Sequence, residues 1–408
     1  MANETKNKNY LSSKEVKAIA KANAKEIKRL EAYKNRKASE EEFLTQMNNP
    51  DNILEIEDLH TFFFTEQGVV KAVNGVSYDV PRHKVVGVVG ESGCGKSVTS
   101  MSVMRLIQGP AGQIVSGSIR FQASDYKRDA HGNPVPKAGG AEGEYELEEK
   151  IYDIAKMPIH EIHRIRGKQV AMIFQEPMTS LNPVFTIGQQ LDEVTLLHVP
   201  GATRELAKAK SEEMLRLVGI IPENVYNAFP HELSGGMRQR VMIAMALAAE
   251  PRLIIADEPT TALDVTIQAQ ILDLLQDIKN KIDGSILLIT HDLGVIAEMA
   301  DYVVVMYAGK VIEKGTVMEI FQDPKHPYTI GLQKSKPTMT LDDSVELYNI
   351  PGNVPNPINM PNHCYFRERC AMCKQTGHKC AGDYPGMVQV SPTHYVACHL
   401  YDKEENNG

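Results

Sequence analysis

The sequence Gly90-Glu91-Ser92-Gly93-Cys94-Gly95-Lys96-Ser97 fits the pattern G-x-x-x-x-G-K-[ST] of a phosphate-binding loop. Glycines allow the backbone to curl so that successive N–H groups point at phosphate oxygens. Lys96 is placed to reach the β- and γ-phosphates, and the Ser97 hydroxyl can bind Mg²⁺. A helix that opens at Ser97 adds the positive end of its dipole. The whole run therefore predicts a binding site for a nucleoside triphosphate and Mg²⁺.

The residues on either side of this loop provide the context that the motif needs. Val85–Val89 is a short apolar run of the kind that forms a buried strand. On the other side, apolar residues recur at helical spacing, at Val98, Met101, Met104 and Ile107. We therefore expect a strand, the loop and a helix in that order.

Composition and charge limit the class of protein. The 408 residues can bury one large α/β core plus a smaller appendage, in one to three domains. The formal net charge of −8 argues against a nucleic-acid-binding protein. No apolar stretch approaches the roughly 18 residues of a transmembrane helix, and the polar, Lys-rich N-terminus is neither a signal peptide nor an anchor. We expect a soluble cytosolic chain whose six cysteines are not in disulfides.

Three regions follow from the pattern along the chain. Residues 1–50 predict a charged, partly helical extension, which is either a solvated spacer or a helix that docks on a partner or a membrane surface. Residues 51–325 form the main domain, with a polar, Gly-rich surface insertion at about 122–149. Residues 326–408 form a small Cys-rich C-terminal domain, in which proline and cysteine density rises after about Lys336.

The order of strands and helices predicts an α/β fold. Alternating apolar and charged residues from Ile53 to about Val80 predict a small antiparallel sheet before the phosphate loop. Beyond the insertion, strands alternate with helices, which argues for a largely parallel sheet. The predicted strands are Val170–Phe174, Leu253–Ala256, Ile286–Ile289 and Val303–Tyr307, and the helices include Arg204–Val218, Met237–Ala249 and Thr266–Lys279.

A second catalytic element lies at the end of a predicted strand. Leu253–Ala256 is followed by Asp257 and Glu258, the form that a Walker B element takes. We expect Asp257 to hold Mg²⁺ through its water shell and Glu258 to polarise the attacking water. A later strand ends at His291, on the edge where parallel sheets gather ligands, so its imidazole could contact the γ-phosphate region.

The run Leu233-Ser234-Gly235-Gly236-Met237, at the head of a predicted helix, resembles the signature loop of ABC transporter ATPases. In that family this loop closes over the γ-phosphate held by the phosphate loop of a second subunit. The resemblance therefore implies a head-to-tail dimer in which Ser234, Gly235 and Gly236 bind nucleotide. Their chemistry agrees, since a serine hydroxyl, flexible glycines and a helix start all favour a bound anion.

Further elements arrive in the order of that family. Gln175 looks like the Q-loop residue, which implies a place beside the Mg²⁺ and the catalytic water, and His291 looks like the switch histidine. Thr261–Asp264 looks like the D-loop, which places Asp264 at the nucleotide. The resemblance covers roughly residues 53–325. It implies a mostly parallel sheet, a helical signature subdomain and a small antiparallel sheet.

The family also stacks an aromatic ring on adenine, ahead of the phosphate loop. Phe64 is our candidate, and its neighbour Phe63 is the alternative. The three residues Phe62–Phe64 fit an ordinary core strand equally well.

Several stretches narrow the resemblance to the ATP-binding subunits of oligopeptide, dipeptide and nickel importers, most like the D-type oligopeptide permease ATPase. These stretches are Phe174–Pro183, Leu233–Arg240, His326–Thr329 and Ile350–Gly352. The resemblance implies ATP hydrolysis that powers peptide import. It also implies a second, F-type ATPase subunit, two membrane permease subunits and a substrate-binding protein, with this chain peripheral at the cytoplasmic face of the membrane.

Other functions remain open from the sequence. A nickel importer ATPase shares the same motifs. A soluble ABC ATPase of DNA repair or translation would act without membrane partners, but such chains usually carry two cassettes or a long coiled coil, and neither is visible here. A third reading is a redox-sensing ATPase that uses its cysteine region as the sensor.

Five cysteines cluster between Cys364 and Cys398, which suggests a metal site. Four thiolates suit either zinc or a [4Fe–4S] cluster, and simple reduced thiols are the third alternative. The C-terminal region of the importer subfamily is similar in layout and can carry a [4Fe–4S] cluster. That resemblance implies four ligands and leaves Cys373 as an extra thiol: the ligands are Cys364, Cys370, Cys380 and Cys398.

The remaining cysteine lies inside the phosphate loop. Cys94 is near a helix start and Lys96, a setting that lowers the pKa of a thiol. We expect a variable filler position whose alkylation blocks ATP binding.

Overall fold

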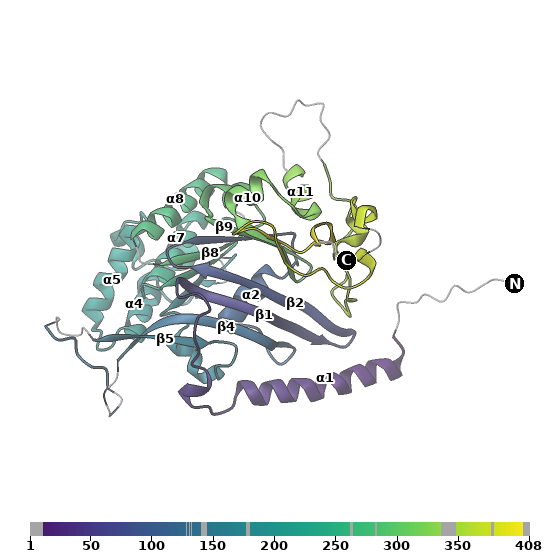
Figure 1. Ribbon diagram of the computed structural model, residues 1–408. Coiled ribbons are helices and arrows are strands. Elements are labelled where there is room, and N and C mark those ends of the chain that lie inside the picture. Colours follow the sequence, from purple (N-terminus) through teal and green to yellow (C-terminus); the bar gives the residue numbers. More distant parts are fainter. Residues whose placement is uncertain are drawn as a thin grey trace.

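The computed structural model of the chain describes residues 11–127, 129, 131, 133–139, 145–176, 180–261, 264–281, 284–335, 348–376 and 379–402. Within these ranges two sheets, four-stranded and eight-stranded, form the body, and helices group at one end and above it (Figure 1).

The larger sheet has the strand order β11-β12-β10-β9-β3-β8-β7-β6. Strands β9, β3, β8, β7 and β6 run parallel, and β10, β12 and β11 extend the sheet in antiparallel fashion. This confirms the predicted largely parallel sheet and its strands to within a residue or two. The bounds are β3 Val85–Val89, β6 Val170–Ile173, β7 Leu253–Asp257, β8 Ser285–Ile289, β9 Tyr302–Tyr307, β10 Lys310–Thr316, β11 Val388–Gln389 and β12 Tyr395–Val396.

The smaller sheet is antiparallel, in the order β2-β1-β4-β5, and confirms the small antiparallel sheet. Its strands are β1 Asn52–Thr65, β2 Gly68–Pro81, β4 Gly112–Tyr126 and β5 Leu147–Asp153. The stretch predicted as an insertion at 122–149 is the end of the β4–β5 hairpin, because Gln122 pairs with Ile151 and Tyr126 with Leu147.

Strand β3 explains why the two sheets stay together. Its five residues are all buried, and successive side chains of a strand point to opposite faces. Val85 and Val89 join the apolar cluster that contains the helices over the main sheet. Val86 and Val88 join the cluster that contains the antiparallel sheet. The loop that follows β3 is therefore held between two cores.

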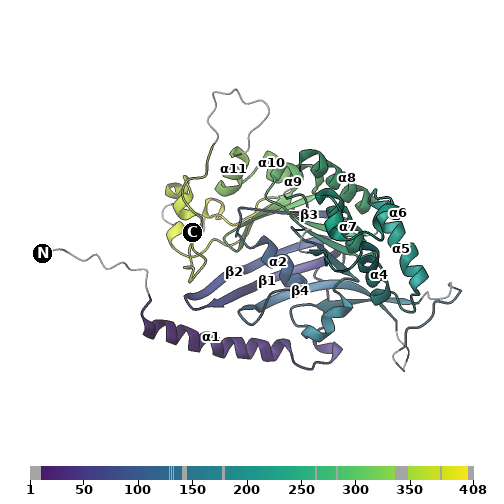
Figure 2. The ribbon, with the colours of Figure 1, turned by 180° about the vertical axis from the view of Figure 1, so that it is seen from behind.

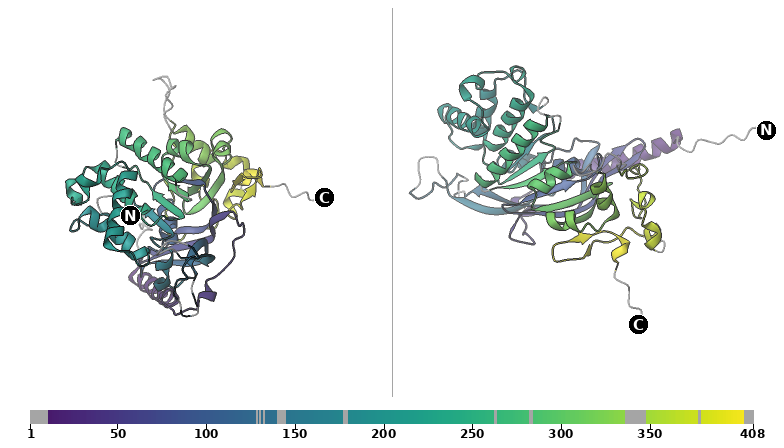
Figure 3. Two further views of the ribbon diagram at one scale, coloured as in Figure 1. Left: turned by 90° about the vertical axis from the view of Figure 1, so that its left-hand side faces the viewer. Right: turned by 90° about the horizontal axis from the view of Figure 1, so that it is seen from above.

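Most of the helices fall into two groups. Helices α4 to α7 form a separate subdomain at one end of the sheets, visible as the teal helices in Figure 3, and α8 to α10 lie over the main sheet (Figure 2). The bounds are α2 Lys96–Val103, α4 Ile187–His198, α5 Arg204–Leu217, α6 Pro222–Val225, α7 Gly235–Leu247, α8 Val265–Lys281, α9 Leu293–Met299, α10 Val317–Gln322 and α11 Pro327–Lys334. Short 3-10 helices occur at Glu40–Glu42, Ile159–Arg164, Pro230–Glu232, Arg367–Arg369, Cys373–Thr376, Lys379–Ala381 and His399–Tyr401.

The predicted helical part of the N-terminal extension is α1, Ser13–Lys34, which begins with a capping box between Ser12 and Glu15. Its side chains Asn23 and Leu30 are buried against the body. Asn23 donates a hydrogen bond of 2.9 Å to the carbonyl of Thr65, at the end of β1. The helix is therefore packed along the antiparallel sheet and does not extend away from it as a solvated spacer (Figure 1).

The C-terminal region is continuous with the main sheet. Strand β12 pairs with β10 through Glu313 and Val396, and Asn74 of β2 donates 3.0 Å to the hydroxyl of Tyr365. In the part of the chain that the structure describes, no helix combines the length and the apolar character that crossing a bilayer requires.

Candidate nucleotide-binding and catalytic site

The phosphate loop follows β3 and leads into α2, which begins at Lys96, one residue before the predicted start. Gly90, Gly93 and Gly95 have φ values of 159°, 78° and 102°. A Cβ on Gly90 would lie 2.2 Å from the carbonyl oxygen of Met306, and one on Gly95 would lie 2.4 Å from that of Ala72. Neighbouring backbone thus leaves room only for glycine at these two positions.

Lys96 is buried, and its ammonium group lies inside the curve of the loop. Nζ donates 2.7 Å to the carbonyl of Gly90 and 3.2 Å to that of Glu91. The positive charge is thus held where the motif places the phosphates.

The two predicted Mg²⁺ ligands from separate elements are in contact. The Ser97 hydroxyl, at the start of α2, donates 3.0 Å to Oδ1 of Asp257, at the end of β7. Burial raises the pKa of Asp257 to about 6. A carboxylate and a hydroxyl are oxygen ligands that suit Mg²⁺, and a bound cation would favour the ionised carboxylate.

Two of the three predicted catalytic residues, Gln175 and His291, converge on one atom of the third, Oε2 of Glu258. Gln175 donates 3.0 Å to this oxygen, and Nδ1 of His291 lies 3.4 Å from it. The Thr261 hydroxyl donates a third contact of 2.9 Å. Glu258 itself has φ 48° and is fixed by its N–H, which donates 2.8 Å to the carbonyl of Ile289.

Strand order accounts for this convergence. Ser97 follows β3, His291 follows β8, Glu258 follows β7 and Gln175 follows β6, and these four strands are consecutive neighbours in the parallel part of the sheet. The carboxyl ends of parallel strands meet at one edge, where α/β proteins bind ligands. The residues were found from separate motifs, and the sheet brings them to that edge.

The predicted signature residues lie elsewhere. Ser234 caps α7, and its hydroxyl accepts the N–H of Met237 at 3.3 Å. A Cβ on Gly235 would meet open space. Among the described residues, no hydrogen bond or ion pair joins Ser234, Gly235 or Gly236 to the phosphate loop of the same chain.

The remaining predicted residues have local partners. Asp264 is exposed and accepts the N–H of Ile267 at 3.0 Å in the first turn of α8, while Ala262 and Leu263 lie outside the described residues. Phe64 is half-buried at the end of β1, opposite Val69. The ring of Phe63 lies against Gly112, and Phe63 is half-buried like Phe64.

Burial overturns the expectation for Cys94. Its side chain is 1% exposed, and burial raises the pKa of the thiol, although Lys96 acts in the opposite direction. Desolvation of the thiolate outweighs the nearby cation, so the predicted lowering of the pKa was wrong.

Sequence reasoning missed several residues that support the site. Gln239, buried in α7, donates 2.6 Å to the carbonyl of Pro259 and links the signature helix to the turn after Glu258. Its signal was a polar residue on the buried face of an apolar helix. Tyr328 and Arg369, from the C-terminal part, contact Glu91 of the phosphate loop. No local pattern marks a contact that spans 278 residues.

The C-terminal cysteines are free, and several of their thiols are neighbours. Burial, with smaller contributions from neighbouring thiols, raises the pKa of Cys364 to about 12 and that of Cys398 to about 11. No three His, Cys, Asp or Glu side chains in the described ranges are arranged to hold a metal ion.

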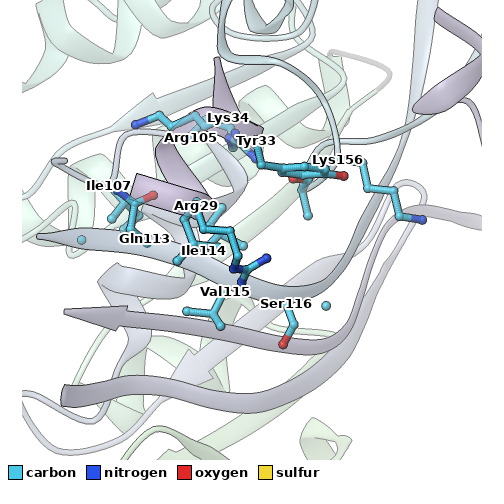
Figure 4. A pocket seen from close by; sticks show the side chains of 14 residues that line it. Arg29, Tyr33, Lys34, Arg105, Ile107, Gln113, Ile114, Val115, Ser116 and Lys156 are labelled. Carbon is cyan, nitrogen blue, oxygen red and sulfur yellow. The ribbon is translucent and has the colours of Figure 1, made fainter. Parts of the chain in front are cut away.

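A cavity of about 220 Å³ lies between α1 and β4 (Figure 4). Its lining includes Arg29, Tyr33, Lys34, Arg105 and Lys156. None of the predicted nucleotide-binding residues lines it, so it is separate from the nucleotide site.

Comparisons with known proteins agree with the geometry. The family described as "ABC transporter" matches residues 73–261, and the family described as "Oligopeptide/dipeptide transporter, C-terminal region" matches residues 312–380. In fold the chain is similar to the dimeric ATP-binding cassette MJ0796 bound to ADP and Pi, with a TM-score of 0.52 and 22% identity over 65% of this chain and 98% of that one.

Curated relatives extend over most of the chain. The oligopeptide transport ATP-binding protein OppD of Bacillus subtilis is 48% identical over 349 residues, which is 85% of this chain and 88% of that protein. The oligopeptide transport ATP-binding protein AppD and the dipeptide transport ATP-binding protein DppD of the same organism are each 44% identical over 354 residues, covering 86% of this chain and 98% and 96% of those proteins. The chain therefore belongs to the ABC transporter family, as an ATPase of its oligopeptide and dipeptide transport branch.

Proposed function

We propose that this chain hydrolyses ATP to power the import of oligopeptides or dipeptides through an ABC transporter complex. The observation that carries the ATPase assignment is the convergence of Gln175, His291 and Thr261 on the Glu258 carboxylate, next to the contact between Ser97 and Asp257. The peptide assignment is supported by the match of residues 312–380 and by the names of the relatives.

Each site residue has a role that its position supports. The loop Gly90–Gly95 and Lys96 hold the phosphates, Phe64 stacks on adenine, and Asp264 contributes to nucleotide binding. Ser97, Asp257 and Gln175 hold Mg²⁺ directly or through water. Glu258 polarises the attacking water, and His291 contacts the γ-phosphate.

The complete site needs a second subunit. In the part of the chain that the structure describes, Ser234, Gly235 and Gly236 make no hydrogen bond or ion pair with their own phosphate loop, and the exposed start of α7 offers a hydroxyl and N–H groups to an anion. We infer a head-to-tail pair with an F-type ATPase subunit, in which each signature loop covers the nucleotide of the other.

The rest of the complex follows from the branch of the family. ABC transporter ATPases are peripheral to the membrane, and we place this one at the cytoplasmic face, below two permease subunits fed by a substrate-binding protein. The stretch from Gln175 to Pro183 would contact a coupling helix of the permease; its residues Pro177, Met178 and Thr179 lie outside the described part of the chain.

We further propose that residues 326–408 act as a small Cys-rich domain with a [4Fe–4S] cluster on Cys364, Cys370, Cys380 and Cys398. The support is chemical, since four thiolates can hold such a cluster and these thiols are close enough to raise one another's pKa, although their arrangement in this structure is not that of a metal site. Zinc and free thiols are the alternatives. Iron and sulfide analysis after anaerobic purification tests this, and absence of both excludes the cluster.

The experiment that tests the proposed function is affinity purification of this chain from detergent-solubilised native membranes. We expect two integral-membrane subunits and a second ATPase to co-purify, with ATP hydrolysis stimulated by the peptide-loaded receptor. Stimulation by nickel instead would identify the chain as the ATPase of a nickel importer. Recovery of the chain alone, from the soluble fraction, would overturn the importer in favour of a soluble or redox-sensing ATPase.

A further inference from the structure

The C-terminal region reaches the phosphate loop through one side chain, Arg369. Its guanidinium makes a two-point ion pair with the carboxylate of Glu91, with Nη1 2.7 Å from Oε2 and Nη2 3.0 Å from Oε1. Paired contacts of this kind between arginine and carboxylate fix orientation as well as charge. Glu91 is the second residue of the phosphate loop, 278 residues away in the sequence.

Arg369 is itself firmly held. Its side chain is 7% exposed, Nε donates 2.9 Å to the carbonyl of Pro351, and Nη1 lies 3.3 Å from the hydroxyl of Tyr307. Tyr307, Tyr328 and Phe366 pack ring against ring beside it, with centroids 4.7 to 5.5 Å apart. These hydrogen bonds and the packed aromatic rings therefore fix the position of the guanidinium.

Glu91 is restrained on three sides. Arg369 binds its carboxylate, the hydroxyl of Tyr328 accepts its N–H at 2.8 Å, and its carbonyl accepts Nζ of Lys96 at 3.2 Å. The first two restraints come from the C-terminal part of the chain. The third comes from the lysine that the motif assigns to the phosphates.

We propose that Arg369 is a positioning residue of the nucleotide site, which holds the phosphate loop in its binding conformation and neutralises Glu91. This inference rests on the proposed nucleotide site and adds a part that neither the loop motif nor the family comparisons assign. Without Arg369, the loop would lose an anchor. The carboxylate of Glu91 would then lack its partner beside the phosphates, which are also negatively charged. Because Arg369 directly precedes Cys370, the same contact makes the cysteine-rich region part of the ATP site.

The test is an equilibrium titration of the full-length chain with a fluorescent ATP analogue, using Arg369→Gln, Arg369→Lys, Glu91→Gln and the double variant Glu91→Gln/Arg369→Gln. We expect Arg369→Gln to weaken ATP binding about tenfold or more, because the half-buried carboxylate of Glu91 is left without its cation in the phosphate loop. Arg369→Lys should recover part of the loss, since it keeps the charge but not the two-point geometry. In the double variant the loss should be close to that of Glu91→Gln alone.

Arg367→Gln is the matched control. It removes the same charge two residues away, from the same short 3-10 helix, and the side chain of Arg367 makes no hydrogen bond or ion pair with the described residues. In the assembled transporter, Arg369→Lys should raise the KM for ATP with little change in kcat, which a general loss of folding would not produce.

The outcomes separate the inference from the proposed function. Failure of the wild-type chain to bind ATP would overturn both. Normal ATP binding by wild type and by Arg369→Gln, or losses that multiply in the double variant, would overturn the role of Arg369 alone. If Arg369→Gln does not fold, Arg369→Lys and Glu91→Gln still decide, because equal ATP affinity in both and in wild type would contradict the proposal.

Discussion

The phosphate-loop region and the C-terminal region are in direct contact but are built on different principles. The first is a backbone structure, with a fully buried five-residue strand and glycines that leave no room for a side chain. Beyond helix α11, the second has two-residue strands and 3-10 helices of three or four residues, and it depends on side-chain contacts. A site made of backbone can be recognised from eight consecutive residues. The side chains that support it become visible only in three dimensions.

The largest effect should come from a catalytic residue of the nucleotide site. Glu258→Gln should lower ATP turnover by about 10² to 10⁴-fold, because an amide cannot act as a base toward the attacking water. ATP should still bind, so the variant should trap an ATP-bound dimer.

Phosphate release by the assembled complex and an ATP titration measure the two effects of Glu258→Gln separately. Glu223→Gln, at an exposed glutamate of α6, is the control. Turnover at the wild-type rate would remove Glu258 from the mechanism.

Backbone packing predicts the next effect. Gly90→Ala should destabilise the fold by about 3 kcal/mol or more, because its Cβ would lie 2.2 Å from the carbonyl of Met306. Gly235→Ala, where a Cβ meets open space, should stay within about 0.5 kcal/mol. Urea unfolding of both variants measures the difference, and equal midpoints would show that the loop can move aside.

A pH effect is expected from the side-chain region. Burial lowers the pKa of His326 from 6.5 to about 4, and its Nδ1 accepts the N–H of Tyr328 at 3.0 Å. The unfolded chain therefore binds a proton below pH 6.5 that the folded chain refuses until about pH 4, so stability is complete above this range and is lost as the pH falls through it. Between pH 7.5 and 5.5 the loss from this group should be about 1.4 kcal/mol.

His326→Asn isolates the contribution of this histidine. Asparagine keeps an acceptor for the helix start but does not titrate, while the nearby carboxylate of Glu313, which accepts the N–H of His326, is unchanged. Denaturant unfolding at the two pH values should show a steeper loss for wild type. Parallel pH profiles would mean that His326 carries its proton in the folded state.

The smallest effect concerns a single contact between the two regions. Tyr365→Phe removes the hydroxyl that accepts 3.0 Å from Asn74 of β2 and should cost about 1 kcal/mol. Tyr348→Phe, at an exposed tyrosine, is the control for loss of a hydroxyl. An unchanged unfolding midpoint for Tyr365→Phe would show that the C-terminal region does not depend on this bond.

These contrasts match what the sequence could and could not predict. The parallel strands and the helices were found from periodicity because their faces are buried by regular packing, as in Val85–Val89. Asp257, Glu258 and His291 were found because each lies at the end of a predicted strand, and Gln175 was found from its resemblance to the Q-loop residue of the family; the fold brings these strand ends together. Arg369 was not found, because its role depends on a partner that no local pattern identifies. The pKa of Cys94 was predicted in the wrong direction, because its burial depends on packing that local sequence does not show.

The position of β3 in the sheet has a consequence for the order in which the molecule can assemble. Synthesis delivers the N-terminal half first, so the antiparallel sheet has all four strands once Asp153 has emerged. Strand β3 pairs with β8 and β9, which are made much later, and the contact from His83 to Ser285 spans 202 residues. Until then both edges of β3 lack partners, and the nascent chain carries a complete phosphate motif without a complete phosphate site.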